Sequence, residues 1–231
     1  MEKLNYRRTF FIGLAFLSIC AFWQMYDNVI PLILQNTFHL NETFTGAIMA
    51  ADNILAVFLL PFFGTLSDKA NTRFGKRTPF IITGTCVAVL FLMLLPFADK
   101  NQNFIMFVAC LAVLLVAMGF YRSPAVALMP DLTPKPLRSK ANAVINLMGA
   151  IGGVYTLLLI RFLVKGGARP DYTAVFAGVA FLMAAAVILL VLTVKEKKIA
   201  AEIEKEEIQE EKLAGEAIAE NTKELPKPVK K

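Results

Sequence analysis

The sequence predicts an all-α, polytopic membrane protein with six transmembrane helices. Hydrophobic residues make up 57% of its 231 residues, and the mean hydropathy is +0.59, well above what a soluble domain shows. Charged residues are almost absent from six runs of about 20 residues, the length that crosses a hydrocarbon core of roughly 30 Å. A soluble protein of this size would scatter charge along every element, so the composition excludes that class.

The six apolar runs are expected at residues of about 10–34, 45–66, 79–97, 103–121, 141–164 and 173–194. They form one transmembrane bundle over residues 1–195, followed by a charged tail at 196–231. In the tail Lys and Glu alternate with isoleucines, so its first half could extend the sixth helix with i,i+4 pairs. Its Pro-Lys-Pro end at 226–228 is expected to be disordered. A solvated tail is favoured over a dedicated binding helix.

The orientation follows from the distribution of Lys and Arg. The end predicted to carry the termini and the 67–78 loop holds most of these residues, whereas the opposite end holds only Lys100, Lys165 and Arg169. The positive-inside rule therefore predicts a multi-pass protein of the cell membrane with both termini cytoplasmic. Topology accounts for the net charge of +6, which is no evidence for nucleic-acid binding.

Two acidic residues interrupt the first two spans. Asp27 and Asp52 each lie about seven residues from the outer end of their own span, roughly 10 Å inside the outer edge, at similar depth on antiparallel helices. Burying an acid in lipid costs several kcal/mol unless it is paired or hydrated. A cation site or a proton-coupled pair is therefore favoured, and structural hydrogen bonding or an interfacial position is the alternative.

Polar neighbours surround these acids. Gln24 and Asn28 share a helical face with Asp27, Trp23 lies nearby, and Asn53 follows Asp52. An aromatic platform beside amides and carboxylates is typical of sugar recognition. Asp27, Trp23, Gln24, Asn28 and Asn53 are therefore candidate substrate-binding residues.

Two further positions have open interpretations. Arg122 closes the predicted fourth span and is either a topology anchor or a side chain that points into a cavity. In the fifth span, small and amide residues form one helical stripe: Asn142, Asn146, Gly149 and Gly153. Helix packing is the favoured role of the stripe, and lining a substrate path is the second. Arg122 and Asn146 join the substrate-binding candidates.

Two cytoplasmic blocks carry a family resemblance. They read Gly64-x-Leu66-Ser67-Asp68-Lys69 with Gly75-Lys76-Arg77, and Tyr121-Arg122-Ser123-Pro124-Ala125 with Pro130-Asp131-Leu132. The first resembles the loop between helices two and three of the major facilitator superfamily. In that loop the second glycine usually follows the aspartate by three residues, and here it follows by seven. The longer form looks like the glycoside–pentoside–hexuronide:cation symporters, in particular their sucrose/proton symporter branch.

The resemblance implies a fold and an activity. The fold would be the N-terminal six-helix half of a transporter that works by alternating access. The activity would be cation-coupled symport of a sugar or glycoside, with Asp27 serving the sugar and Asp52 the cation. Melibiose-type members carry another acid in helix four, and none lies between Asn103 and Tyr121. A proton is therefore favoured over sodium, and no cofactor or metal is expected.

The resemblance also implies a conformational gate in the charged loop. Asp68 is expected to pair with Arg77 or Arg138 and to hold an outward-open state. The full set of gate candidates is Gly64, Asp68, Lys69, Arg73, Gly75, Lys76, Arg77, Asp131 and Arg138.

Six helices supply only one wall of such a transporter. The expected partner, besides the bilayer and a sugar, is a second six-helix half, contributed by a separate chain or by a homodimer; a truncated product is the third interpretation. The alternatives in function are a non-transporting membrane subunit or remnant, and a symporter of another small organic solute. The sequence holds no catalytic constellation, so an enzyme is not expected.

Overall fold

The computed structural model describes residues 4–164, 170–205 and 208. Over these residues the chain is helical and contains no strand. The six long helices are α1 (Tyr6–Asn36), α2 (Glu42–Lys69), α3 (Thr78–Lys100), α4 (Phe104–Asp131), α5 (Arg138–Leu163) and α6 (Thr173–Thr193), with a short 3₁₀ turn η1 (Lys135–Leu137) before α5. All six are long and apolar enough to cross a membrane. The predicted all-α class with six spans is confirmed.

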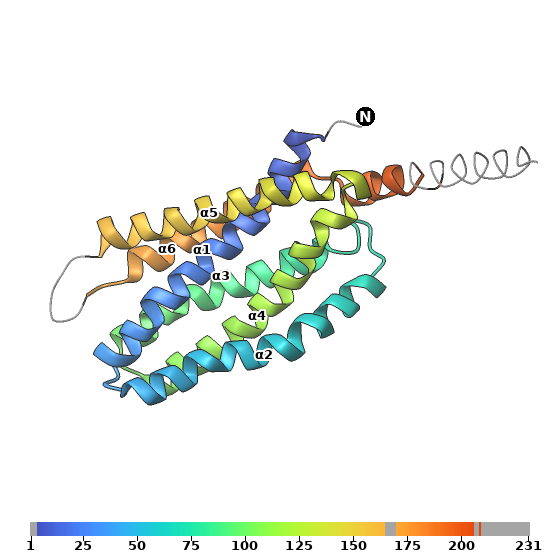
Figure 1. Cartoon of the computed structure of the whole chain (residues 1–231). Coiled ribbons are helices and arrows are strands. Elements are labelled where there is room, and N and C mark those ends of the chain that lie inside the picture. Colours follow the sequence, from blue (N-terminus) through green and yellow to red (C-terminus); the bar gives the residue numbers. More distant parts are fainter. Residues whose placement is uncertain (1–3, 165–169, 206–207, 209–231) are drawn as a thin grey trace, which may run out of the picture.

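Successive helices run in opposite directions and place their connections at two ends of the bundle (Figure 1). Helix α1 packs against α5 and α6, α3 packs against α4 and α6, and α2 lies against α4. One end carries the described N-terminal residues, the 70–77 loop, the 132–137 segment and the residues that follow α6 (Figure 1). This end is called the basic end below.

The end of the fourth helix differs most from the predicted spans. Helix α4 continues to Asp131, ten residues past the predicted end at Tyr121. Its added turns pass through Pro124 and bury Leu128 and Met129 against the bundle, so packing outweighs the proline. Arg122 is therefore inside a helix and not at its end.

The sixth helix also differs from expectation. Helix α6 stops at Thr193, and Val194 adopts an extended conformation (φ −103°, ψ 106°) before helix resumes at residues 196–205. The tail is therefore not a continuous extension of α6. Ile203 in this segment is buried against the bundle, whereas the predicted disordered end at 226–228 lies outside the described residues.

Close helix crossings hold α1 at the centre of the bundle. A Cβ at Gly152 of α5 would overlap the carbonyl oxygen of Leu17, so only glycine permits this approach. One turn further, Thr156 Oγ1 donates to the carbonyl of Ala21 (2.9 Å). The packing role predicted for the stripe applies to Gly149, whose Cβ would meet Cys20 and Phe16 of α1. Gly152 makes the tightest contact and is not in that stripe.

A buried hydroxyl pair joins α1 to α4. Ser18 Oγ and Tyr121 Oη lie 2.6 Å apart, and both are within 3.0 Å of the Ala15 carbonyl oxygen. A Cβ at Gly84 of α3 would meet the backbone of Tyr121, which brings α3 against the same turn of α4. These contacts place the residues around Arg122 next to α1.

Candidate functional site

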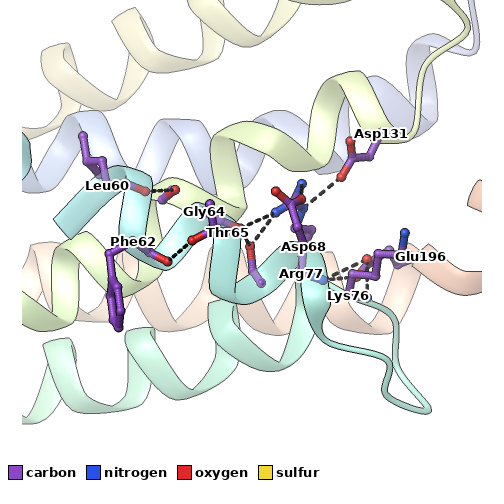
Figure 2. A network of polar contacts seen from close by, with 11 residues as sticks. Leu60, Phe62, Gly64, Thr65, Asp68, Lys76, Arg77, Asp131 and Glu196 are labelled. Atoms are coloured by element: carbon purple, nitrogen blue, oxygen red, sulfur yellow. Dashed lines mark hydrogen bonds and ion pairs between the residues drawn. The ribbon is translucent and has the colours of Figure 1, made fainter. Parts of the chain in front are cut away.

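The guanidinium of Arg77 is the centre of a polar network at the basic end (Figure 2). Its Nη2 lies 2.5 Å from Asp68 Oδ1 at the end of α2, and its Nε lies 2.9 Å from Asp131 Oδ2 at the end of α4. Its Nη1 donates to Ser67 Oγ and to the carbonyl of Gly64 (3.4 Å). Arg77 is only 6% exposed. A buried guanidinium shared by two carboxylates ties α2, α3 and α4 together.

Glu196, which follows α6, closes the same network from the other side (Figure 2). Its carboxylate accepts the backbone N–H groups of Lys76 (2.7 Å), Arg77 (2.9 Å) and Thr78 (2.8 Å) and the hydroxyl of Thr78 (2.7 Å). Helix α3 has no capping side chain at its own N-cap position. Glu196 therefore supplies both the missing acceptor and a negative charge at the positive end of the helix dipole.

The backbone at Gly75 makes room for this carboxylate. Gly75 has φ +126°, a conformation that side-chain-bearing residues rarely adopt, and a Cβ there would overlap the Glu196 carboxylate. Sequence reasoning missed Glu196. The available signal was an acid directly after the last span, together with a third span that starts at Thr-Pro without a capping Ser, Asp or Asn before it.

The remaining gate candidates are Arg138, Lys69, Arg73 and Lys76. Arg138 Nε donates to the carbonyl of Thr133 (3.2 Å), and of the two expected partners of Asp68, Arg77 forms the ion pair described above. The side chains of Lys69, Arg73 and Lys76 are exposed. Lys76 contributes through its backbone N–H alone.

The two intramembrane acids lie at matching depth. Asp27 precedes the end of α1 at Asn36 by nine residues, and Asp52 follows the start of α2 at Glu42 by ten, which is roughly 14 Å of helix in each case. Asp27 is exposed and Asp52 is half-buried. Asp52 Oδ1 accepts the backbone N–H (2.7 Å) and the side-chain amide (3.0 Å) of Asn53.

Arg122 lies next to Asp52 in a small pocket between α1, α2 and α4. Its guanidinium carbon is 5.4 Å from the ring centre of Trp23, a cation–π contact. Trp23, Asp52, Leu59, Gly119 and Arg122 line the pocket. The space in it is about 20 Å³, room for about one water molecule and not for a sugar. Of the two interpretations of Arg122, the structure supports the cavity-facing one.

Two buried donors near this pocket have no hydrogen-bond partner within the described part of the chain. They are Trp23 Nε1 and Tyr26 Oη, on the same face of α1. Buried polar atoms are nearly always satisfied, so these two atoms mark a place where water or a ligand group belongs. Tyr26 was not among the predicted site residues. Its spacing of three from Trp23 and its position beside Asp27 were the signals.

The remaining candidates lie apart from the pocket. Asn28 Nδ2 donates to the backbone carbonyl of Gln24 (2.7 Å), and Gln24 Oε1 faces Gly153 of α5. Asn146 is exposed on α5 and donates to the carbonyl of Asn142 (2.9 Å). The structure therefore brings together Trp23, Asp52 and Arg122, with Asp27 nearby, and leaves Asn146 on another helix.

Comparisons with known proteins agree with this architecture. Residues 11–229 match the family model of the Major Facilitator Superfamily. The chain is 24% identical to sucrose transport protein SUC3 of Arabidopsis thaliana over 151 residues, covering 57% of this chain and 25% of that protein. It is 29% identical to sucrose transport protein SUC4 of the same plant over 113 residues, covering 42% and 22% respectively.

The chain thus spans about a quarter of the length of the curated relatives that it matches. Both relatives agree with the predicted resemblance to the sucrose/proton symporter branch. With six membrane-crossing helices over the described residues and a family match across most of its length, the chain belongs to the Major Facilitator Superfamily and is a multi-pass membrane protein of a transporter family, not an enzyme.

Proposed function

We propose that this chain forms one half of a proton-coupled symporter for a sugar or glycoside. The observation that carries the proposal is the polar cluster of Trp23, Asp52 and Arg122 around one pocket, with Asp27 at the depth of Asp52. An exposed carboxylate such as Asp27 at that depth cannot face lipid without a cost of several kcal/mol. The face that bears it is therefore covered by water or by a second helical bundle.

In this mechanism Asp52 carries the proton. Its carboxylate lines the same pocket as the Arg122 guanidinium, and protonation removes the attraction between the two charges while Arg122 keeps its contact with the Trp23 ring. Arg122 is then free to bind a sugar hydroxyl, while Asp27 and the unsatisfied Trp23 Nε1 supply an acceptor and a donor. Coupling follows because protonation of Asp52 releases the Arg122 guanidinium for the sugar, so that the proton and the sugar bind together.

A second bundle completes the site. Only Thr45, Phe63 and Ser67 of α2 are buried, and α5 also exposes large apolar side chains such as Leu147, Val154 and Phe162. The partner bundle would seat against α2 and α5, contributed by a separate chain, a second copy or a continuation of the same polypeptide. Light scattering of the 25.5 kDa chain in detergent separates a homodimer from a monomer that requires a partner.

The Lys/Arg distribution supports an orientation in the plasma membrane in which the basic end faces the cytoplasm. In that orientation the Arg77 network acts as a gate that holds the outward-open state. Labelling by an impermeant maleimide tests this in whole cells. Cysteine at position 101 should react from outside and cysteine at position 139 should not; the reverse pattern contradicts the orientation.

Uptake of radiolabelled sucrose into proteoliposomes tests the transport proposal. The chain is reconstituted with and without its partner bundle, under an imposed proton or sodium gradient. A proton gradient should drive accumulation, and Asp52→Asn should abolish it while Glu42→Gln, an exposed acid on the same helix, leaves it intact. If no sugar moves and Asp27→Asn and Asp52→Asn change nothing, the alternative of a non-transporting subunit is favoured. If the chain takes up another solute and no sugar, it is a symporter of that other solute.

A further inference from the structure

We propose that the groove between α3 and α6 binds one anionic phospholipid, with its phosphate on a cluster of cations at the basic end and an acyl chain along the two helices. This site lies on a different face from the Trp23–Arg122 pocket. The proposal does not depend on the transported solute or on the coupling ion.

Four cations gather where α3 and α6 approach each other at the basic end. They line a pocket of about 400 Å³ together with Phe74 and the ends of the two helices; they are Arg73, Lys195, Lys197 and Lys198. Arg73 comes from the 70–77 loop, and the three lysines follow α6, so two distant segments supply the charge. All four side chains are exposed.

These cations are largely uncompensated. Among the residues that the structure describes, only Lys198 has an acidic partner, Glu202, at 3.8 Å. Glu196 sits between two of the lysines but is only 4% exposed, and its oxygens accept hydrogen bonds from four donors at the start of α3. Its negative charge therefore interacts with the N–H groups at the start of α3 and not with the four cations, and the cluster stays positively charged.

An apolar groove continues from this pocket into the membrane-spanning part. It has a volume of about 360 Å³ and is bounded by Cys86 and Val89 on α3 and by Ala184, Ile188 and Val191 on α6. Val191 also lines the cation pocket, so the two cavities are adjacent. From Ala184 to Leu192 the groove follows α6 for roughly 12 Å. The small side chains of Cys86 and Ala184 leave the space open.

The combination selects the ligand class. A phosphate diester satisfies cations that have no other partner, and basic pockets at the ends of membrane helices bind anionic headgroups for this reason. Phe74 is 65% exposed beside the pocket, as expected for an aromatic side chain at the membrane interface. A soluble phosphate would leave the apolar groove empty, whereas a phospholipid fills both parts.

Native mass spectrometry of the full chain in detergent tests the site, with phosphatidylglycerol as the probe and phosphatidylcholine as the comparison. The chain should retain one phosphatidylglycerol in preference to phosphatidylcholine. The triple variant Arg73→Gln/Lys195→Gln/Lys197→Gln should weaken this binding roughly tenfold or more. The control Arg7→Gln/Lys140→Gln/Lys205→Gln removes the same charge from exposed positions outside the pocket and should bind as the unmodified chain does.

A second arm tests the acyl chain. Ala184→Phe fills the groove without changing charge and should lower phosphatidylglycerol retention, while Ile105→Phe, a lipid-exposed position on α4 (81% exposed), should not. Equal retention by the triple variant and its control overturns the headgroup site. Equal retention by Ala184→Phe and the unmodified chain, or full displacement of the lipid by glycerol phosphate, overturns the lipid assignment in favour of a soluble anion.

Discussion

Glu196 holds Thr78 at both its backbone N–H (2.8 Å) and its hydroxyl (2.7 Å), although 118 positions separate the two residues. The contact fastens the segment after α6 to the first turn of α3. It also sits directly beside Arg77, whose guanidinium joins α2 to α4. A single buried carboxylate therefore connects the last helix to the charged loop that marks the family.

Loss of the Glu196 charge should destabilise the bundle. In Glu196→Gln, an amide group replaces one acceptor oxygen in front of three N–H groups, and the interaction with the helix dipole is lost. The expected cost is about 1–2 kcal/mol of unfolding free energy, measured by thermal or denaturant unfolding in detergent. Glu202→Gln, an exposed acid paired with Lys198, is the control and should change stability little. Equal effects of the two variants would contradict the capping role.

Gly75→Ala tests the backbone next to this carboxylate. Its Cβ overlaps Glu196, and its φ of +126° is strained for alanine, so a loss of about 1–3 kcal/mol is expected. In a Glu196→Ala background the overlap disappears and only the backbone strain remains. The loss should therefore be smaller there, as a double-mutant cycle measures. An identical loss in both backgrounds would show that Glu196 does not press on this glycine.

Gly152→Ala should loosen the crossing of α1 and α5. The added methyl group overlaps the Leu17 carbonyl oxygen, which is backbone and cannot rotate away. Separation of the helices should cost about 1–3 kcal/mol, read from the melting temperature. The adjacent Gly153→Ala is a matched control, because its Cβ would lie 3.7 Å from the nearest atom, Gln24 Oε1. A larger effect at position 153 than at position 152 would refute this helix crossing.

Asp68→Asn should weaken transport and leave substrate affinity nearly unchanged. The change removes one of the two carboxylate charges that pair with Arg77. Asp68 lies at the basic end, far along α2 from Asp52. Initial uptake rates and sucrose binding, measured on the same preparation, separate the two quantities. Equal loss of rate and affinity would argue against a gate.

The contacts of Asp171 with Thr173 and Lys100, at the end of the bundle opposite the basic end, should be sensitive to acid. The hydroxyl (2.5 Å) and backbone N–H (2.9 Å) of Thr173, with Lys100 Nζ at 3.1 Å, lower the pKa of Asp171 to about 2. The folded pKa is depressed below the unfolded value of about 3.9, so the stabilisation is present above pH 4 and is lost as the pH falls toward 2. The melting-temperature difference between the unmodified chain and Asp171→Asn should shrink over that range, and a constant difference would be the contrary result.

The sequence by itself determined the class of this protein. Six apolar runs, the polar breaks between them and the placement of Lys and Arg are local properties that the bilayer translates directly into spans. The similar depth of Asp27 and Asp52 followed from the same count, because a helix advances a fixed distance per residue, although both lie roughly 14 Å and not roughly 10 Å from their helix ends. The family motif in the charged loop is likewise contiguous and therefore readable.

Only the tertiary structure decided which residues meet. Arg122 faces Trp23 because α4 runs on through Pro124, a gain of packing that hydropathy does not report. Gly152, not the predicted stripe alone, carries the closest approach of α5 to α1. Glu196 reaches α3 because helix α6 ends at Thr193 and Val194 is extended, so that a new helix begins at residue 196. Each of these depends on the rotation of one helix against another, which is set by side-chain packing across the whole bundle.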